Sequence, residues 1–568
     1  MRRAGRLVAL AALIGLALAA PATAATARTR STIPQPLVTG APALPPTLVS
    51  SRDAVPKGFR HTPAQVLAIA RADPRVRAAL RGHPHATPYE YTRGAPNWQV
   101  SWFSDARPAK EILQVYVDDD TGGVTQVWAG FQIAWTMARG YPGAFGRQVN
   151  AWYVWIGLCL LFMAPFLSRR LTLVHLDLAV LLGFSISLAF FNHGMIGLSV
   201  PLVYPFLIYL LVRMLLLANR RGLPRRPLAS WVPDRWLGAA AIGLMGFRIG
   251  LNVLNSNVID VGFAGVIGAD KLVHGQPLYG GWPKDNMYGD TYGPFSYYAY
   301  VPFRLIFGWS GAWDSLPAAH AASICIDVLA FVGLFVLGRR LRGVSLGVLL
   351  SYCWAAYPFT LYALESNTND SLVAVMLVLA LLVVSSAPAR GVVALLAGMT
   401  KFAPFALAPL LLRGSGKRPR ERSVAAFVIA FAVAAFVVML PVLLHSGLSR
   451  FWQHSIVYQS DRVTPFSVWG LWGGLGVVQH LLQGAVIALA LGAAFLPERR
   501  GPVEVAALSA AILIALQLVA NYWLYPYVVW FFPMVIVALL AGHPTSVQAS
   551  VREWVRRPPE PVASGSPG

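Results

Sequence analysis

Apolar runs long enough to cross a lipid bilayer recur from Ala151 onward, and no other feature limits the possible folds so strongly. A helix needs about 20 such residues to span a hydrocarbon core about 30 Å thick. Of the 568 residues, 56% are hydrophobic and only 12% are charged, and the mean hydropathy is +0.56. This composition excludes a soluble globular protein and indicates an integral membrane protein.

The charge distribution agrees with a membrane protein. The formal net charge is +22, but the basic residues fall in short clusters between the apolar runs, as membrane topology requires. We therefore expect no nucleic-acid partner. Cys159, Cys325 and Cys353 lie in apolar segments without disulfide or metal-ligand spacing, so no metal or other cofactor is expected.

Basic clusters between the apolar runs predict the topology, because cytoplasmic loops are rich in Arg and Lys. They place segments 255–315 and 445–465 outside the cell, and the tail 542–568 in the cytoplasm. The predicted spans are 151–168, 173–191, 196–218, 236–254, 316–337, 344–363, 371–386, 423–444, 481–496, 503–520 and 526–541.

The apolar segment 390–414 has cytoplasmic charge at both ends, so it must cross the membrane an even number of times. We predict two half-spans, 391–400 and 402–412, that meet near the external side at Thr400 and Lys401. An ammonium group is costly in lipid, so we expect Lys401 to face a water-filled cavity or an anion.

The N-terminal part predicts an exported soluble domain. Residues 1–25 read as a signal peptide and 26–59 as a Pro-rich linker. Residues 60–135 predict an external α+β domain, with a helix that starts at Thr62 and Pro63, and then strands.

The strand pair "VYVDDDTGGVTQVW", with a turn at Asp120 to Gly123, follows that helix. The order of helix and hairpin resembles the PepSY-type domains of the bacterial envelope. Three consecutive aspartates, Asp118 to Asp120, allow cation binding, but a solvated hairpin turn is the favoured interpretation.

One polar stretch, "NVIDVGFAGVIGADKLVHGQPLYGGWPKDNMYGDTYGPFSYYAYVPF", interrupts the apolar chain at 257–303. It holds four aspartates and many tyrosines, and its glycines and prolines argue against a long helix. We predict a large external loop, whose apolar end 295–309 lies along the membrane interface.

Residues 236–541 resemble the GT-C superfamily of membrane glycosyltransferases, and within it the bacterial polyprenyl-phosphate-mannose-dependent mannosyltransferases. The matching features are a first span and a long external loop that has an early acid in "NVID" and ends in the Tyr- and Pro-rich segment "TYGPFSYYAYVPF". The segments "ESNTNDSLVAVMLVLAL", "LAGMTKFAPFALAPLLL" and "FWQHSIVYQSDRVTPFSVWG" follow in the expected order. The fold class expected is mainly α, a polytopic membrane helix bundle of GT-C type with a small N-terminal α+β domain.

The resemblance implies a sugar transferred from a lipid phosphate on the external face, with inversion and without a nucleotide. It leaves 150–225 as three extra transmembrane helices, and places the catalytic base in the first external loop, at Asp260. A carboxylate at the membrane surface can serve as base when its pKa is raised. Asp285 and Asp290 lie in a turn-rich stretch, where turn residues are the favoured interpretation and contact with the acceptor or a metal is the alternative. Both stay in reserve as the base if Asp260 is not.

A departing phosphate needs cations. We expect Lys401 with the external residues Arg450, His454 and Arg462 as its cradle, although Arg462 has an alternative partner in Asp461. Among the aromatic residues of the external loop, Tyr292 is a candidate for contact with a sugar face, but interfacial aromatic belts are equally expected. Asp327 lies within a span, where a buried ion pair is the favoured role.

The sequence thus predicts a multi-pass glycosyltransferase of the cell membrane that moves a hexose, with mannose expected, from a polyprenyl-phosphate sugar to an envelope lipid or glycan. Two alternatives stay open. A transporter or flippase would show two related halves with broken helices, and no such repeat is visible. A non-catalytic assembly factor would have no need of Asp260 or Lys401.

Overall fold

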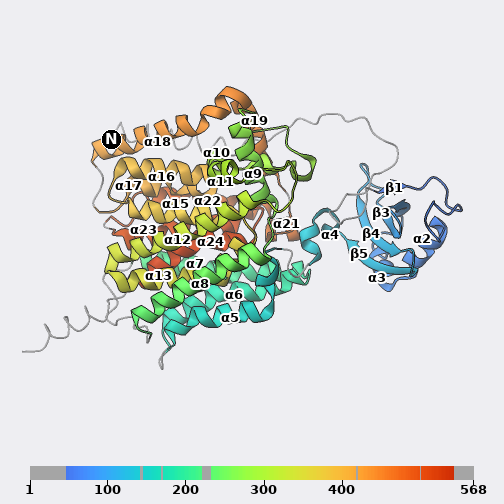
Figure 1. Ribbon diagram of the computed structural model, residues 1–568, viewed down its shortest axis with the longest axis horizontal. Coiled ribbons are helices and arrows are strands. Elements are labelled where there is room, and N and C mark those ends of the chain that lie inside the picture. Colours follow the sequence, from blue (N-terminus) through green and yellow to red (C-terminus); the bar gives the residue numbers. More distant parts are fainter. Residues whose placement is uncertain are drawn as a thin grey trace, which may run out of the picture. The chain divides into compact units, whose positions relative to one another are not determined.

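The computed structural model describes residues 46–140, 145–167, 171–219, 232–416, 420–462, 464–498 and 500–542. The predicted signal peptide, most of the linker and nearly all of the tail lie outside these residues. The chain divides into two compact units, one ending at Thr136 and the other beginning at Met137 (Figure 1).

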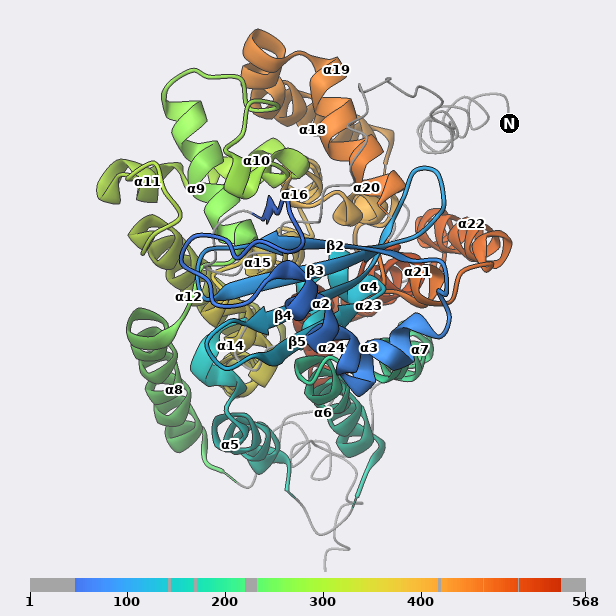
Figure 2. The ribbon, with the colours of Figure 1, turned by 90° about the vertical axis from the view of Figure 1, so that its right-hand side faces the viewer.

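The N-terminal unit is an antiparallel sheet with strand order β1-β2-β3-β4-β5, and α2 and α3 pack on one face of it (Figure 2). The core between helices and sheet includes Val66, Val76, Trp98, Trp102 and Val115. The elements are β1 Thr47–Leu48, α2 Pro63–Ala72, α3 Pro74–Leu80, β2 Thr87–Thr92, β3 Asn97–Phe103, β4 Glu111–Asp118, β5 Gly123–Ala129 and α4 Phe131–Ala134. The α+β prediction for this part is confirmed.

The first helix starts where the sequence predicts. Thr62 caps α2 with its hydroxyl on the amide of Gln65, the Gln65 side chain accepts from the Thr62 amide, and Pro63 is the first helical residue. The helix does not run unbroken to Leu80, because Asp73 leaves the helical conformation and caps the new helix α3.

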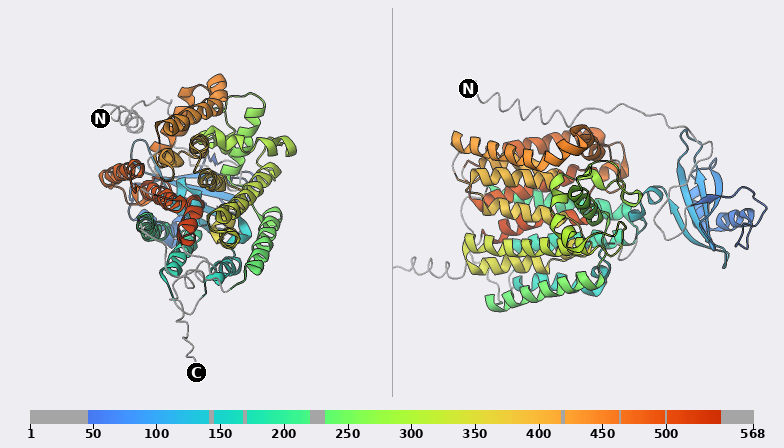
Figure 3. Two further views of the ribbon diagram at one scale, coloured as in Figure 1. Left: turned by 90° about the vertical axis from the view of Figure 1, so that its left-hand side faces the viewer. Right: turned by 45° about the horizontal axis from the view of Figure 1, so that its top comes forward.

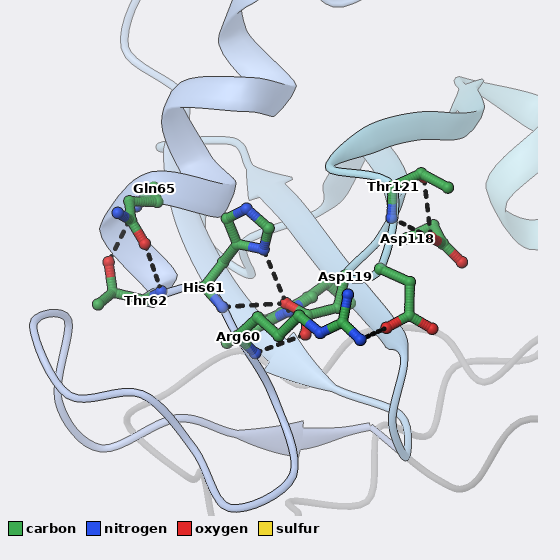
Figure 4. Close-up of polar contacts among 9 residues, drawn as sticks. Arg60, His61, Thr62, Gln65, Asp118, Asp119 and Thr121 are labelled. Carbon is green, nitrogen blue, oxygen red and sulfur yellow. Dashed lines mark hydrogen bonds and ion pairs between the residues drawn. The ribbon is translucent and has the colours of Figure 1, made fainter.

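The three consecutive aspartates lie at the hairpin between β4 and β5, and Asp119 is the buried one (Figure 4). Its carboxylate accepts from the amides of Arg60 and His61 at 2.6 and 3.2 Å, and from the indole of Trp98 at 2.8 Å. Burial desolvates this carboxyl, yet these hydrogen bonds outweigh the desolvation and lower the pKa of Asp119.

The two flanking aspartates are also engaged. Asp118 accepts from the amide and the hydroxyl of Thr121, both at 2.8 Å, and Asp120 lies 3.3 Å from the guanidinium of Arg60. The Asp118 contacts are those of a hairpin turn, the interpretation that the sequence favoured, whereas Asp119 is buried rather than solvated and both Asp119 and Asp120 contact Arg60.

The second unit is a bundle of long helices that run side by side, as the two views of Figure 3 show. Among the described residues, six helices are long and apolar enough to cross a membrane, or up to seven if the bent pair α13–α14 is one span. These helices are α6 Leu173–Asn192, α7 Ile196–Ala218, α8 Asp234–Asn255, α12 Pro317–Arg342, α13 Val344–Ala356 with α14 Pro358–Glu365, α18 Glu421–Pro441 with its π-helical end Val442–Ser446, and α23 Pro502–Val519. The polytopic helical fold is confirmed.

The remaining predicted spans are helical but shorter than about 20 residues. They are α5 Trp152–Met163 with its extension Ala164–Phe166, α15 Asp370–Leu382, α16 Ala387–Thr400, η6 Ala403–Leu407 with α17 Ala408–Arg413, α22 Gly476–Gly492, and η9 Tyr525–Tyr527 with α24 Val528–Leu540. The predicted break between two half-spans is observed, because α16 ends at Thr400 and Lys401 is extended.

The stretch 257–303 corrects one expectation. It holds a helix of 14 residues, α9 Asp260–Val273, although its glycines argued against a long helix. Gly262, Gly265 and Gly268 let this helix pack closely, since a Cβ at these positions would clash with the carbonyl of Asn367 and with the rings of Tyr300 and Tyr297 respectively. The glycines are contact positions, and the error lay in reading them as helix breakers.

Short helices follow α9 and gather with it at one end of the bundle (Figure 1). They are η4 Lys284–Asn286, η5 Gly289–Thr291, α10 Pro294–Tyr298 and α11 Val301–Phe307. None of them is long enough to cross a membrane, as predicted for the apolar end of this stretch. In α11 the side chains of Leu305, Ile306 and Phe307 are exposed.

Asp327 forms the buried ion pair that the sequence favoured. Its carboxylate binds the guanidinium of Arg248 at 2.5 and 3.0 Å, and the indole of Trp354 donates to it at 2.9 Å. Arg248 also donates to the hydroxyl of Thr360 at 3.0 Å. The pair therefore joins α8 and α12 to the bend between α13 and α14.

Candidate functional site

The start of α9 is fastened to the core of the bundle. The amides of Asn257 and Ile259 donate to the carbonyls of Glu365 and Ser366, both at 3.2 Å. These contacts join the residues after α8 to the turn between α14 and α15, where the whole run from Glu365 to Asp370 is buried. These hydrogen bonds therefore fix the position of Asp260, the first residue of α9, next to this buried polar run.

Asp260 combines exposure with desolvation. Its side chain reaches solvent, yet the surrounding protein desolvates the carboxyl and so raises its pKa. The amide of Val261, Arg462 and Lys401 oppose this rise, whereas the negative charge of Asp370 adds to it. Two cations and a second carboxylate thus lie within electrostatic range of Asp260. Within the described residues, Asp260 itself forms no ion pair.

Lys401 lies in the gap between α16 and η6, and its ammonium contacts the carboxylate of Asp370 at 2.7 Å. The indole of Trp530, on α24, donates to the same carboxylate oxygen at 2.7 Å. The ammonium also lies 5.1 Å from the ring centroid of Tyr292 and 5.4 Å from those of Tyr527 and Trp530. Cation–π attraction and the ion pair therefore hold a buried ammonium in place.

Arg462 follows the short helix α20 Tyr458–Asp461. Its guanidinium stacks over Tyr522 at 4.2 Å and lies 5.8 Å from the ring of Tyr458. A guanidinium that stacks on its flat face directs its N–H donors outward in the ring plane, an arrangement that suits planar anions such as phosphate. The sequence alternative, a pair with Asp461, involves a side chain outside the described part of the structure.

His454 and Asp290 contact each other rather than Lys401. The imidazole Nδ1 of His454, on the π-helix η8 Trp452–Val457, lies 2.8 Å from the carboxylate of Asp290. Burial raises the pKa of Asp290, although the amide of Gly280 and His454 oppose the rise. Asp290 is therefore buried and joins the segment 257–303 to the segment 445–465. This role differs from that of an aspartate that only forms a turn.

Two predicted residues take no part in these contacts. Asp285 in η4 and Arg450 in α19 Leu448–Phe451 are both exposed. The structure thus brings Asp260, Lys401, Arg462 and Tyr292 together, and pairs His454 with Asp290.

Sequence reasoning missed the aromatic residues Tyr458, Tyr522, Tyr527 and Trp530, and above all Asp370. A signal for Asp370 was present, because "ESNTND" is a polar run between two apolar helices, where buried polar groups are costly unless they have a role. Among the described residues, no group of three or more His, Cys, Asp or Glu side chains is placed to hold a metal ion. Lys401 and Arg462 are two cations that act electrostatically on Asp260.

Comparison with known proteins adds an independent finding. No curated protein matches the chain. The family model described as Glycosyltransferase family 87, a family of GT-C type, matches residues 291–524, which is less than half of the chain. The match includes Asp370, Lys401 and Arg462 but begins after Asp260. A matched region that carries these residues within a bundle of apolar helices indicates a membrane glycosyltransferase.

Proposed function

We propose that the protein transfers a hexose, with mannose as the expected sugar, from a polyprenyl-phosphate donor to an envelope lipid or glycan on the extracytoplasmic face. The carrying observation is the exposed carboxylate of Asp260, within electrostatic range of Lys401 and Arg462. A general base beside two cations suits a reaction that removes a proton at one atom and releases a phosphate at another.

In the proposed reaction, the acceptor hydroxyl oxygen forms a bond to the anomeric carbon while the bond from that carbon to the phosphate oxygen breaks. Attack from the side opposite the phosphate inverts the anomeric centre. The hydroxyl proton passes to Asp260, and the electron pair of the broken bond stays with the polyprenyl phosphate. Asp260 loses one negative charge as the phosphate gains one, so the net charge of the site does not change.

Each charged residue has a distinct part in this scheme. Lys401 is already paired with Asp370, and the pair is neutral as a unit. Its ammonium has further N–H groups with which to donate to a phosphate oxygen. Arg462 supplies the net positive charge, and its planar fork suits bidentate contact with phosphate. The raised pKa of Asp260 favours proton uptake in the transition state.

Donor and orientation can be tested together on the full-length protein in nanodiscs. We expect transfer from radiolabelled polyprenyl-phosphate hexoses with release of polyprenyl phosphate, and none from nucleotide sugars. Transfer from a nucleotide sugar alone would contradict the proposed donor. Movement of the intact sugar lipid between leaflets of proteoliposomes, without release of polyprenyl phosphate, would support the flippase instead.

The extracytoplasmic face is tested in cells with an impermeant thiol reagent. A cysteine that replaces Met287 in a cysteine-free variant should react in intact cells, since Met287 lies between η4 and η5 and is 52% exposed. A cysteine that replaces Ser345, near the start of α13, should react only after permeabilisation. The reverse pattern would place the site in the cytoplasm.

A further inference from the structure

A stacked pair of tyrosines lies beside the site and has no part in the scheme above. The rings of Tyr288 and Tyr458 are 5.2 Å apart and nearly parallel, at 17°. Tyr288 lies in the turn between η4 and η5, whereas Tyr458 starts α20, so two separate loops form the pair. The side chain of Tyr288 is 60% exposed. An exposed aromatic face held by stacking offers contact area at little cost in conformational entropy.

This tyrosine pair is the solvent-exposed end of a continuous row of side chains in contact, which consists of aromatic residues and Arg462. Arg462 lies against both Tyr458 and Tyr522, and the ring of Tyr522 is 6.2 Å from that of Tyr527. Tyr527 in turn stacks on Trp530 at 4.4 Å, next to the buried Lys401–Asp370 pair. The row therefore connects the solvent to the proposed position of the donor phosphate.

Contacts on the same turn place the pair beside Asp260. The side-chain amide of Asn286, two residues before Tyr288, donates to the backbone carbonyl of Asp260 at 2.8 Å. Desolvation raises the pKa of Tyr458, and the negative charges of Asp260 and Asp290 raise it further against the effect of Arg462. The hydroxyl of Tyr458 thus lies within electrostatic range of the proposed base.

We propose that Tyr288 and Tyr458 form the acceptor subsite, on which the ring of an acceptor hexose lies while one of its hydroxyls reaches Asp260. This proposal rests on the proposed function, because the donor phosphate takes the Lys401 end of the row and leaves the exposed end to the acceptor. A sugar ring matches such a surface, since its axial C–H groups form an apolar face and its hydroxyls point outward.

The pair is also distinguished from an aromatic belt at the lipid interface. Belt residues are single side chains whose rings face the headgroups. Here two loops hold the rings in register, through the contact of His454 with Asp290 and the donation of the Tyr279 amide to the hydroxyl of Ser446 at 3.2 Å. Such fixed geometry is required to position a reacting hydroxyl.

Saccharide binding can be measured without donor, so that it is independent of transfer. The probe is a panel of methyl hexosides and linear dihexosides, followed by saturation-transfer NMR on the full-length protein in nanodiscs free of glycolipid and glycoside detergent. We expect Tyr288→Ala and Tyr458→Ala to weaken binding about three- to tenfold, whereas Tyr288→Phe and Tyr458→Phe keep it. The matched control is Trp236→Ala, because Trp236 is 62% exposed but lies near the start of α8, about 30 Å along the helix from its other end.

Equal binding by wild type and both alanine variants, or no binding by wild type, would overturn the subsite. Thermal melting of each variant excludes unfolding as the cause of a loss, and the phenylalanine variants test the ring without the hydroxyl. The two proposals fail in different ways. Saccharide binding that depends on both tyrosines, without any sugar transfer, would remove the proposed function and keep the saccharide site. Sugar transfer with an unchanged acceptor KM in Tyr288→Ala and Tyr458→Ala would remove the acceptor subsite and keep the proposed function.

Discussion

Two buried ion pairs in the bundle differ in what surrounds them. Around Arg248 and Asp327, protein groups take up the hydrogen-bonding capacity, with Trp354 and Thr360 among the partners. Around Lys401 and Asp370, the ammonium faces three aromatic rings and lies within range of the exposed Asp260. The first pair is held by protein groups on every side for which a contact is described, and it serves structure. The second keeps donors available, which is what a binding site needs.

The largest effect is expected at the structural pair. Asp327→Asn leaves a buried guanidinium without its counter-charge, which costs about 3–5 kcal/mol of stability. The measurement is thermal unfolding of the detergent-purified protein, where we expect a large drop in Tm and in expression. The double variant Arg248→Met with Asp327→Leu should recover much of the loss. A normal Tm for Asp327→Asn would remove the distinction between the two pairs.

The second effect is expected at the site pair and concerns turnover. Lys401→Met removes a donor to the departing phosphate, so turnover should fall by about 10²-fold. The drop in Tm should be smaller than for Asp327→Asn, because the variant replaces the ammonium with an apolar group among aromatic rings. Rates of transfer per folded molecule measure the effect. Full turnover with a collapsed Tm would make Lys401 a structural residue like Arg248.

The third effect is a shift of the pH profile. Protonated Asp260 cannot accept a proton, so activity should fall as the pH drops through its pKa, which desolvation raises above the ordinary value. The charge of Asp370 adds to that rise, so Asp370→Asn should lower the pKa and move the acidic limb to lower pH. Asp285→Asn, on the exposed turn, should leave the limb in place. A limb that Asp370→Asn moves upward would contradict the electrostatic coupling.

The smallest effect belongs to a partly exposed pair. The guanidinium of Arg304 contacts Asp270 at 2.6 Å, and both side chains are partly accessible to water. Because water screens such pairs, Arg304→Met should cost no more than about 1 kcal/mol. The same unfolding assay measures it, and a loss as large as that of Asp327→Asn would show that burial does not separate these pairs.

The comparison also explains how much the sequence could predict. Long apolar runs were sufficient to predict the helix bundle. A charged residue between two half-spans was sufficient to make Lys401 a candidate for the site. Its partner Asp370 lies 31 residues before it in the chain, and Trp530 lies 160 residues after Asp370, so only the packing of α15, α16 and α24 brings them together. In α9 the glycines were misread, since the rings of Tyr297 and Tyr300 that they accommodate come from the following helices. Pairings across distant elements are thus what the sequence left undetermined.

The central claim is that Asp260 is the base of a glycosyl transfer, and one comparison tests it most directly. Asp260→Asn, Asp285→Asn and Asp290→Asn are assayed side by side for hexose transfer from a polyprenyl-phosphate donor, together with donor binding. Because the amide keeps the size of the carboxylate but accepts no proton, Asp260→Asn should transfer about 10²-fold more slowly with donor binding retained. Asp285→Asn should transfer hexose at a near-normal rate. Any loss of transfer in Asp290→Asn should come from the weakened contact with His454. Near-normal transfer by Asp260→Asn would contradict the account.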